Sequence, residues 1–542
     1  MYIYPNTTIK ILHNVSLNND YDHTIYFASE QAQRTFFDNP IRVKYTLNNQ
    51  QYQRKERGWM QVNLNQNQLW DCTYLMFQNT HYTLAPSGSI GTSYKWFYAF
   101  ILNVEYVNEN VSKINFEIDE IQTWMFDYVL DKCFVEREHT LTDNLYENTV
   151  EEGLDLGNEY WVQKNYKYDF DCTRVAIVES GYWNRTADKF TAYAPTKMGN
   201  YLTGLHYQCY DLKDIDTTDP NYPNSSSVMY AHIQDYISHG IEDAIVGIYQ
   251  YPRFMGRIPS TGPDSYNYAY TDISFSPELT TIGGYTPKNK KLFCYPYNFI
   301  EIDDCNGNTA EYKLEQWYPD GHTGEFRIWG TPFGIPTCLC FPRFYDGEQQ
   351  NIQHGLSIQF DIQNPWVGDA YSIWLARNQK NFVMENALNG ARVVAGFIAN
   401  NPDAMIRGSV NISENILNKI RRKNELEATP GTVHGHTVNS LLNLQATNSG
   451  IIFRQKAIKA EFAKIIDEYF SRFGYACNRI KKPNTHVRQN WTYTKTVGCE
   501  IVGNLPSDSI AKIKQIYDHG ITFWSDGLNI GNYGDFTNPI LS

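Results

Sequence analysis

Short runs in which every second residue is apolar recur along most of this chain. One run occupies residues 102–106, and the alternation resumes over 114–118 after a polar turn at 108–110. Successive side chains of a strand point to opposite faces, so this pattern on both sides of a short turn predicts a β-hairpin. Further strands are predicted over 42–47, 59–64, 174–179, 292–302 and 356–362. The chain is therefore predicted to be mainly β.

A helical period replaces this alternation near the C-terminus. Over residues 454–473 the apolar positions follow one face of a helix, and Gly474 stands at the expected stop. A second helix is predicted over 507–519, where Ile510, Ile513 and Ile516 share a face and Gly520 follows the last turn. The predicted fold class is mainly β within an α+β chain, with a few C-terminal helices.

Residues 387–420 differ from the rest because small and apolar residues mix there with helix breakers. The turn at 400–403 separates two halves of ~15 residues, each ~22 Å long if helical and thus shorter than a ~30 Å bilayer core. This composition suits a loop that touches a membrane or fills a channel, and it suits equally a helical hairpin in an ordinary core. The candidate membrane-active or plug residues are Val393, Val394, Gly396, Phe397, Ile398, Met405, Ile406, Ile412, Ile416 and Ile420.

The length of 542 residues implies several domains, because single hydrophobic cores stop growing at roughly 250–300 residues. The β domains are expected to be barrels or sandwiches. The predicted segments are an N-terminal β domain over 1–136, an inserted β and irregular domain with long loops over 137–290, a second β domain over 291–386, the apolar loop over 387–452, and a C-terminal helix–strand part over 453–542.

The charge balance is acidic, with a formal net charge of −13. General nucleic-acid binders are normally basic, so this balance argues against a protein that captures DNA or RNA. It suits a wall past which DNA slides without sticking, because like charges repel. Many ordinary soluble proteins are equally acidic, so charge alone does not choose between these two interpretations.

Signatures of catalysis and of cofactor binding are missing from the sequence. It contains no phosphate-binding glycine motif, no His-Glu-x-x-His and no Gly-x-Ser-x-Gly. The ten cysteines include no Cys-x-x-Cys pair, so reduced thiols are expected and no zinc site is predicted. The acidic pairs at 151–152 and 303–304 are of the kind that glycosidases use, but a long β-rich chain offers such pairs by chance. We therefore expect no enzyme, no metal and no cofactor.

Two other groups of residues have a functional and an ordinary interpretation. His434 and His436 offer two metal ligands, although such a pair in a Gly/Thr loop is more often exposed to solvent. The basic run 479–483, with Arg488 and Trp491 nearby, suits nucleic-acid or phosphate binding, but we favour an exposed interface strip. Neither a signal peptide nor an ordinary transmembrane helix is predicted.

An ordered set of segments carries a family resemblance. The N-terminal ones are MFQN at 76–79, KWFYAF at 95–100, FEIDEIQTWMFD at 116–127, REH at 137–139 and EEGLDLGNEY at 151–160. The densest ones are FGYACNRIKKPN at 473–484, DHGITFW at 518–524 and NIGNY at 529–533. In this order they resemble the tail-knob (distal tube) proteins of small short-tailed phages of the phi29 type. The resemblance covers nearly the whole chain except residues 161–290.

The resemblance implies a homo-hexameric ring or tube at the distal end of a phage tail, with genome DNA passing through its lumen without sequence recognition. It implies other tail proteins as partners, namely the lower collar or proximal tube and the appendages. In that family a Gly-rich apolar loop plugs the tube and is thought to be released to penetrate the host cytoplasmic membrane. Residues 387–420 stand at the corresponding place. The protein would be made in the host cytoplasm and located at the tail tip of the virion.

The loop departs from the family pattern because it is charged. The family's loop is nearly uncharged, whereas this one carries Arg392, Asp403, Arg407, Glu414 and Lys419. Each such charge costs a few kcal/mol in hydrocarbon unless it snorkels or pairs. An assembly that turns these charges to a wet centre is therefore favoured over a loop that simply spans the membrane.

Two alternative functions stay open at this stage. One is a tail-borne hydrolase that digests cell-wall polysaccharide with a pair of carboxylates. The other is a receptor-binding adsorption protein, in which Tyr193, Tyr201, Tyr207 and Tyr210 of the Tyr-rich segment 184–287 stack on sugar rings. Interface or core positions are the more ordinary interpretation of these tyrosines.

Overall fold

A computed structural model describes residues 6–84, 90–157, 159–193, 196–198, 201–203, 206–211, 226–256, 269–276, 279–305, 307–317, 324–331, 337–359, 366–368, 432–434, 442–443, 450–534 and 537–541. The chain forms two compact units. Unit 1 contains Met1–Leu156, Gly284–Leu292 and Ala460–Ser542, and unit 2 contains Gly157–Gly283 and Phe293–Lys459. Each unit therefore joins segments that lie far apart in the sequence, and the five consecutive segments proposed from the sequence stay a prediction.

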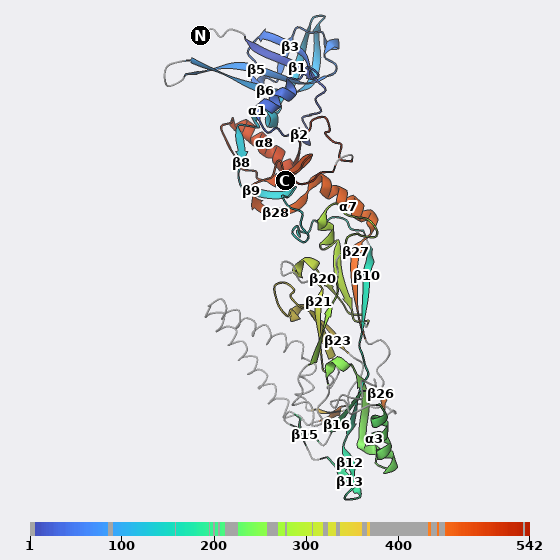
Figure 1. The fold of residues 1–542 in the computed structure, drawn as a ribbon. Coiled ribbons are helices and arrows are strands. Elements are labelled where there is room, and N and C mark those ends of the chain that lie inside the picture. Colours follow the sequence, from blue (N-terminus) through green and yellow to red (C-terminus); the bar gives the residue numbers. More distant parts are fainter. Residues whose placement is uncertain are drawn as a thin grey trace. The chain divides into compact units, whose positions relative to one another are not determined.

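Unit 1 is built on a six-stranded and a five-stranded sheet. The six-stranded sheet has the order β3 (Val43–Gln50), β1 (Thr7–His13), β5 (Cys72–Leu84), β6 (Ile90–Asn108), β7 (Val111–Ile118) and β4 (Trp59–Val62). Figure 1 labels β1, β3, β5 and β6 among its blue strands. The five-stranded sheet has the order β2 (His23–Ile25), β31 (Ile521–Trp524), β29 (Trp491–Val497), β9 (Cys133–Glu138) and β28 (Tyr475–Lys481). A small ribbon pairs β30 (Ile501–Gly503) with β8 (Tyr128–Leu130).

Strand β5 shows why the six-stranded sheet is apolar on both faces. Tyr74 and Met76 enter one hydrophobic cluster, whereas Leu75 and Phe77 enter a second, and all four side chains are fully buried. Neighbouring residues of a strand point to opposite faces, so a continuous apolar run places side chains in two cores. The predicted hairpin at 102–118 is confirmed as the antiparallel pair of β6 and β7.

The helices of unit 1 are α1 (Glu30–Phe37), α2 (Glu120–Trp124), α7 (Ala460–Phe473) and α8 (Ser507–His519). Helix α8 matches its predicted bounds, and Ile513 and Ile516 are buried in the cluster that also contains Leu12 and Phe37. Sequence from both ends of the chain thus shares one core. Gly520 follows α8 with a positive φ of 103°, and a Cβ there would collide with the Tyr493 ring.

The predicted helix over 454–473 is wrong in its first part. Residues 450–458 form strand β27 (Gly450–Ile458), and α7 begins only at Ala460. Ile451, Phe453, Gln455 and Ala457 are fully buried, so the buried positions of β27 follow a period of two. β27 pairs with a strand on each side, and these backbone hydrogen bonds override the local helical pattern.

The described residues of unit 2 form three four-stranded sheets and several two-stranded ribbons. The first has the order β10 (Tyr160–Asp169), β27, β19 (Asn298–Asp303) and β20 (Thr309–Tyr312). The second has the order β16 (His206–Asp211), β11 (Arg174–Glu179), β17 (Ile245–Tyr251) and β26 (Leu442–Asn443). The third has the order β18 (Ala269–Ser274), β21 (Glu325–Thr331), β22 (Thr337–Pro342) and β23 (Leu356–Gln359). The ribbons pair β12 (Gly181–Asn184) with β13 (Lys189–Ala192), β14 (Thr196–Met198) with β15 (Tyr201–Thr203), and β24 (Trp366–Gly368) with β25 (Thr432–His434).

Helix α3 (Ser226–Ser238) packs on the second sheet of unit 2 and was not predicted. Its Tyr236 is buried with Val175 and Ile177 of β11 and Ile248 of β17. The strand predicted over 292–302 is shorter than expected, since β19 begins at Asn298. Before it, the Cys294 carbonyl accepts the N–H groups of Tyr297 and Asn298 and closes a turn. The prediction of a mainly β chain is confirmed.

Candidate functional site

The predicted plug or membrane-active segment 387–452 includes the described strands β25 and β26 and reaches the start of β27. Gly368 at the end of β24 lies directly opposite Thr432 at the start of β25. β24 and β25 therefore pair with each other although 63 residues separate them in the sequence. The candidate residues Val393, Val394, Gly396, Phe397, Ile398, Met405, Ile406, Ile412, Ile416 and Ile420 all fall between these strands and outside the described residues.

Unit 1 contains a dense group of buried polar side chains around Asp467 of α7. The Asp467 carboxylate is fully buried and accepts hydrogen bonds from the Tyr285 hydroxyl at 2.7 Å, the Lys288 N–H at 2.7 Å, the Asn289 N–H at 3.0 Å and the Asn289 Nδ2 at 2.8 Å. Ser471, one turn later, donates to the Asp467 carbonyl and accepts from Asn289 Nδ2. We call Asp467, Asn289, Ser471 and Tyr285 the Asp467 cluster. It fixes residues 284–292 to helix α7.

His139 lies beside this cluster as a neutral imidazole. Its Nδ1 accepts the Tyr493 N–H at 2.8 Å, so its Nε2 carries the proton and donates to the Ser471 carbonyl at 3.3 Å. Burial lowers the pKa of His139 to about 3, and the charge of Arg488 acts in the same direction. Both ring nitrogens are occupied by backbone groups. His139 is therefore a structural link and does not act as a base on the Ser471 hydroxyl.

Two buried glutamates also join distant segments of unit 1. Glu152, with a fully buried side chain, forms ion pairs with Arg137 and Lys291. Glu138 pairs with Lys481, and its second oxygen accepts the Asn484 N–H at 2.8 Å. Buried charges need such partners, because leaving water costs each ion several kcal/mol.

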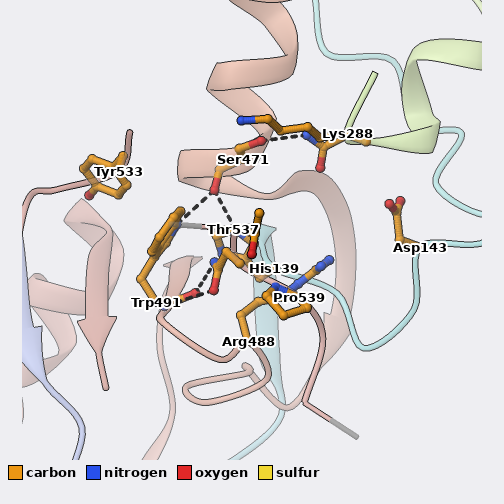
Figure 2. Close-up of a pocket in the computed structure, with 11 residues that line it drawn as sticks. His139, Asp143, Lys288, Ser471, Arg488, Trp491, Tyr533, Thr537 and Pro539 are labelled. Carbon is orange, nitrogen blue, oxygen red and sulfur yellow. Dashed lines mark hydrogen bonds between the residues drawn. The ribbon is translucent and has the colours of Figure 1, made fainter. Parts of the chain in front are cut away.

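A cavity of about 230 Å³ opens next to the Asp467 cluster (Figure 2). Its lining includes His139, Asp143, Lys288, Arg488 and Trp491. The position of Arg488 is set by backbone pairing between residues 487–489 and 539–541. Its side chain lies beside Pro539 in Figure 2. Only 8% of Arg488 is exposed, and no described residue forms a hydrogen bond or ion pair with its guanidinium. We call this cavity the Arg488 pocket.

The acidic pairs considered for glycan cleavage are engaged in structural contacts. Glu152 belongs to the ion-pair group described above. Asp303 pairs with Arg454 at 2.6 Å, and Asp304 accepts the Asn308 N–H at 2.9 Å and its side-chain amide at 2.6 Å. The nearby arginine also lowers the pKa of Asp303 against the opposing effect of burial. These carboxylates hold strands and turns together.

The histidine pair and the basic run proposed from the sequence do not form binding sites among the described residues. His434 is the last residue of β25, whereas His436 lies outside the described residues. In the part of the chain that the structure describes, no group of His, Cys, Asp and Glu residues could hold a metal ion. In the basic run, Ile480 is 74% exposed but Lys481 pairs with Glu138. Trp491 is buried, so it offers no stacking surface for a nucleic acid.

Two of the four tyrosines considered for sugar binding are core residues. Tyr207 and Tyr210 are buried. Tyr193 donates to Glu179 at 3.1 Å and stacks on His206 with ring centroids 3.8 Å apart. Tyr201 lies in β15. Among the described helices, none has the length and apolarity to cross a membrane.

The sequence analysis missed Asp467 and noted Arg488 only as a neighbour of the basic run. A local signal for Asp467 exists, since it lies between Ala463, Ile466 and Phe470 on the buried stripe of α7. An acidic residue inside an apolar stripe predicts a buried carboxylate that needs donors. Nothing local marks Arg488, because its pocket is assembled from segments distant in sequence.

Known protein families match both halves of the chain. A model described as the Caudoviral major tail protein N-terminus matches residues 5–129. A model described as the C-terminal domain of the Bacillus phage phi29 tail knob protein gp9 matches residues 261–535.

Individual relatives are similar over almost the full length. The tail knob protein gp9 of Bacillus phage B103 is 24% identical, with 98% of both chains covered. The tail knob protein gp9 of Bacillus phage phi29 is 25% identical, with 97% of this chain and 98% of its own length covered. The structure of the bacteriophage C1 tail knob protein gp12 has a TM-score of 0.57 and 12% identity, and the match covers 99% of this chain and 100% of that one.

Proposed function

The chain belongs to the family of the phi29 tail knob protein gp9, and from this premise we propose that it builds the distal tube of a phage tail as a hexameric ring. As a member of this family it is a structural component of a phage tail that associates with other tail proteins. The proposed tube conducts genome DNA through its lumen without sequence recognition. Its further proposed partners are the lower collar or proximal tube and the appendages.

The observation that carries this proposal is the extent of the family match. A tail-protein match at the N-terminal end and a tail-knob match at the C-terminal end occur in one chain, and curated knob proteins align with 98% of it. The net charge of −13 is compatible with a conduit for DNA, because phosphates are repelled by an acidic wall.

We propose that the segment between β24 and β25 plugs the tube and contacts the host cytoplasmic membrane during genome ejection. The pairing of Gly368 with Thr432 supports this role, because it holds the two strands that flank the segment beside each other. Its apolar run at 393–398 supplies the surface that enters a lipid interface. Its charges favour an assembly that turns them to water.

A structural role is proposed in preference to a hydrolase. Glu152 and Asp303 are each paired with a cation. A catalytic carboxylate pair needs one member that holds a proton and one that faces the substrate. Incubation of the purified protein with host cell wall is expected to release no soluble sugar, and measurable turnover would contradict the structural role.

Electron microscopy of the assembled protein tests the ring. We expect a closed ring with an axial bore wide enough for duplex DNA, and a monomer as the stable form in the virion would contradict the proposal. Dye release from anionic liposomes tests the loop separately. A variant with Val393, Val394, Phe397 and Ile398 changed to Ser is expected to release less dye while keeping the ring. The matched control is Ile480→Ser, which removes an exposed apolar side chain outside the loop and is expected to leave dye release unchanged.

A further inference from the structure

Arg488 is a buried cation whose hydrogen-bonding groups are not satisfied by the protein. The guanidinium has five N–H donors, and its Nε is fully enclosed without an acceptor among the described residues. Every other buried charge described above has a direct partner: Asp467 accepts four hydrogen bonds, and Glu152 has two cations. Burial of an ion without such partners is unfavourable, so an acceptor is expected at this place.

The cavity beside Arg488 has room for that acceptor. Its volume of about 230 Å³ is several times the ~30 Å³ that one water molecule occupies in the liquid. Asp143 lies on the opposite side of the pocket in Figure 2, and its carboxylate already binds the Tyr475 hydroxyl at 2.6 Å. Burial is the largest influence on the pKa of Arg488 and lowers it, whereas the charges of Tyr475 and Asp143 oppose this effect.

The remaining lining groups leave the pocket with a positive balance. Lys288 is a second cation, and its backbone N–H, not its ammonium, is used by Asp467. His139 is neutral, and Asn538 is saturated because Oδ1 accepts the N–H groups of Asn490 and Trp491 while Nδ2 donates to the Trp491 carbonyl. The Arg488 guanidinium therefore provides the available donors, and Lys288 adds a second positive charge at the lining, against the single carboxylate of Asp143.

We propose that the Arg488 pocket binds a small oxyanion, a phosphate or carboxylate group, held in a two-point contact by the Arg488 guanidinium and favoured by the additional positive charge of Lys288. The planar fork of arginine matches two oxygens of either group, and charge-assisted bonds of this kind are among the strongest in proteins. The anion belongs to a free ion or to a larger molecule that presents the same group. This proposal does not rest on the proposed tube or on the apolar loop.

Thermal unfolding of the full-length protein tests the site. The probes are inorganic phosphate and acetate, each compared with chloride at the same ionic strength so that screening is constant. A ligand that binds only the folded state raises the midpoint, and we expect a rise of at least about 2 °C at saturating concentration for one of the two probes. A response to phosphate alone assigns a phosphate group, and a response to acetate alone assigns a carboxylate. No response to either overturns the proposal.

Arg488→Gln is expected to abolish the response to the effective probe. Arg42→Gln is the matched control, because Arg42 is equally buried at 7% exposed and also has an Nε without a partner, but it donates to the Phe36 carbonyl and lies outside the pocket. Arg42→Gln should lower the midpoint and keep the anion response. An anion response that persists in Arg488→Gln overturns the proposal.

Lys288→Gln keeps the test decisive if Arg488→Gln does not fold. Lys288 is exposed and its structural hydrogen bond comes from the backbone, so this variant should fold as the wild type does. We expect it to weaken anion binding by up to roughly threefold to tenfold, because one nearby positive charge is lost. Unchanged affinity in Lys288→Gln removes Lys288 from the site and, with a non-folding Arg488 variant, contradicts the proposed two-cation pocket.

Discussion

Asp467 and Arg488 are two buried charges in the same unit with opposite surroundings. Asp467 is fully buried and has four donors around its carboxylate, whereas Arg488 is 8% exposed and its guanidinium has no hydrogen-bond partner among the described residues. Burial alone therefore does not reveal what a charge does. A saturated buried charge stabilises the fold, and an unsaturated one faces a space that another molecule can fill.

The saturated charges of unit 1 connect segments that are far apart in the sequence. Asn289 and Asp467 are 178 residues apart, Lys291 and Glu152 are 139 apart, and Asn484 and Glu138 are 346 apart. These contacts hold the short segment 284–292 between the two ends of the chain. Their removal should therefore destabilise unit 1 as a whole.

The largest effect is expected for Asp467→Ala. The substitution leaves the Tyr285 hydroxyl and the N–H groups of Lys288 and Asn289 buried without an acceptor. At 1–3 kcal/mol for each of these three abandoned donors, unit 1 should lose at least about 3 kcal/mol, measured by urea unfolding. Asp508→Ala is the control, because that side chain is 65% exposed and should have little effect. A loss below about 1 kcal/mol would show that water replaces the carboxylate and would break the distinction drawn here.

Glu152→Gln is expected to cost about 3 kcal/mol, because it leaves the buried Lys291 ammonium without its counter-charge. The double variant Glu152→Gln with Lys291→Met should recover much of this loss, since both members of the pair are then neutral. Equal stability of the single and double variants in the same denaturation assay would indicate that Arg137 alone carries the interaction.

Elements set by local sequence features were predicted correctly, whereas features set by contacts between distant segments were not. Helix α8 was predicted because its apolar face and Gly520 are local features. The predicted start of α7 was wrong because β10 and β19, which are distant in sequence, pair with Gly450–Ile458 and hold it as a strand. Arg488 is one residue of a pocket whose other side comes from residues 139–143 and 288–289. No local pattern could indicate that its guanidinium has no partner.

A smaller, pH-dependent effect is expected from His139. Its folded-state pKa is about 3 and its unfolded value lies near 6.5, so the unfolded chain binds the proton more readily. The stability that neutral His139 provides is present above pH 6.5 and is lost as pH falls from 6.5 toward 3. Between pH 6.5 and pH 5 the loss should be about 2 kcal/mol at ~1.4 kcal/mol per pH unit.

His139→Asn isolates this contribution from the other titrating groups. An asparagine oxygen can accept the Tyr493 N–H, so the fold should persist while the ionisable group is removed. The slope of unfolding free energy against pH between 6.5 and 5 should be shallower in the variant. Parallel slopes for the two proteins would mean that His139 is protonated in the folded state and adds to the positive charge of the Arg488 pocket.

The smallest effect on stability is expected for Arg488→Met in protein freed of anions by dialysis. Methionine keeps the length of the side chain, and the substitution removes a charge that has no direct partner to lose. The free energy of unfolding should stay within about 1 kcal/mol of the wild type. A higher value is also expected to be possible, because replacing a buried charge by an apolar group is often stabilising. With saturating anion the order should reverse, since only the wild type gains stability from the ligand. A loss as large as that of Asp467→Ala without anion would place Arg488 among the saturated charges, and the comparison between the two regions would fail.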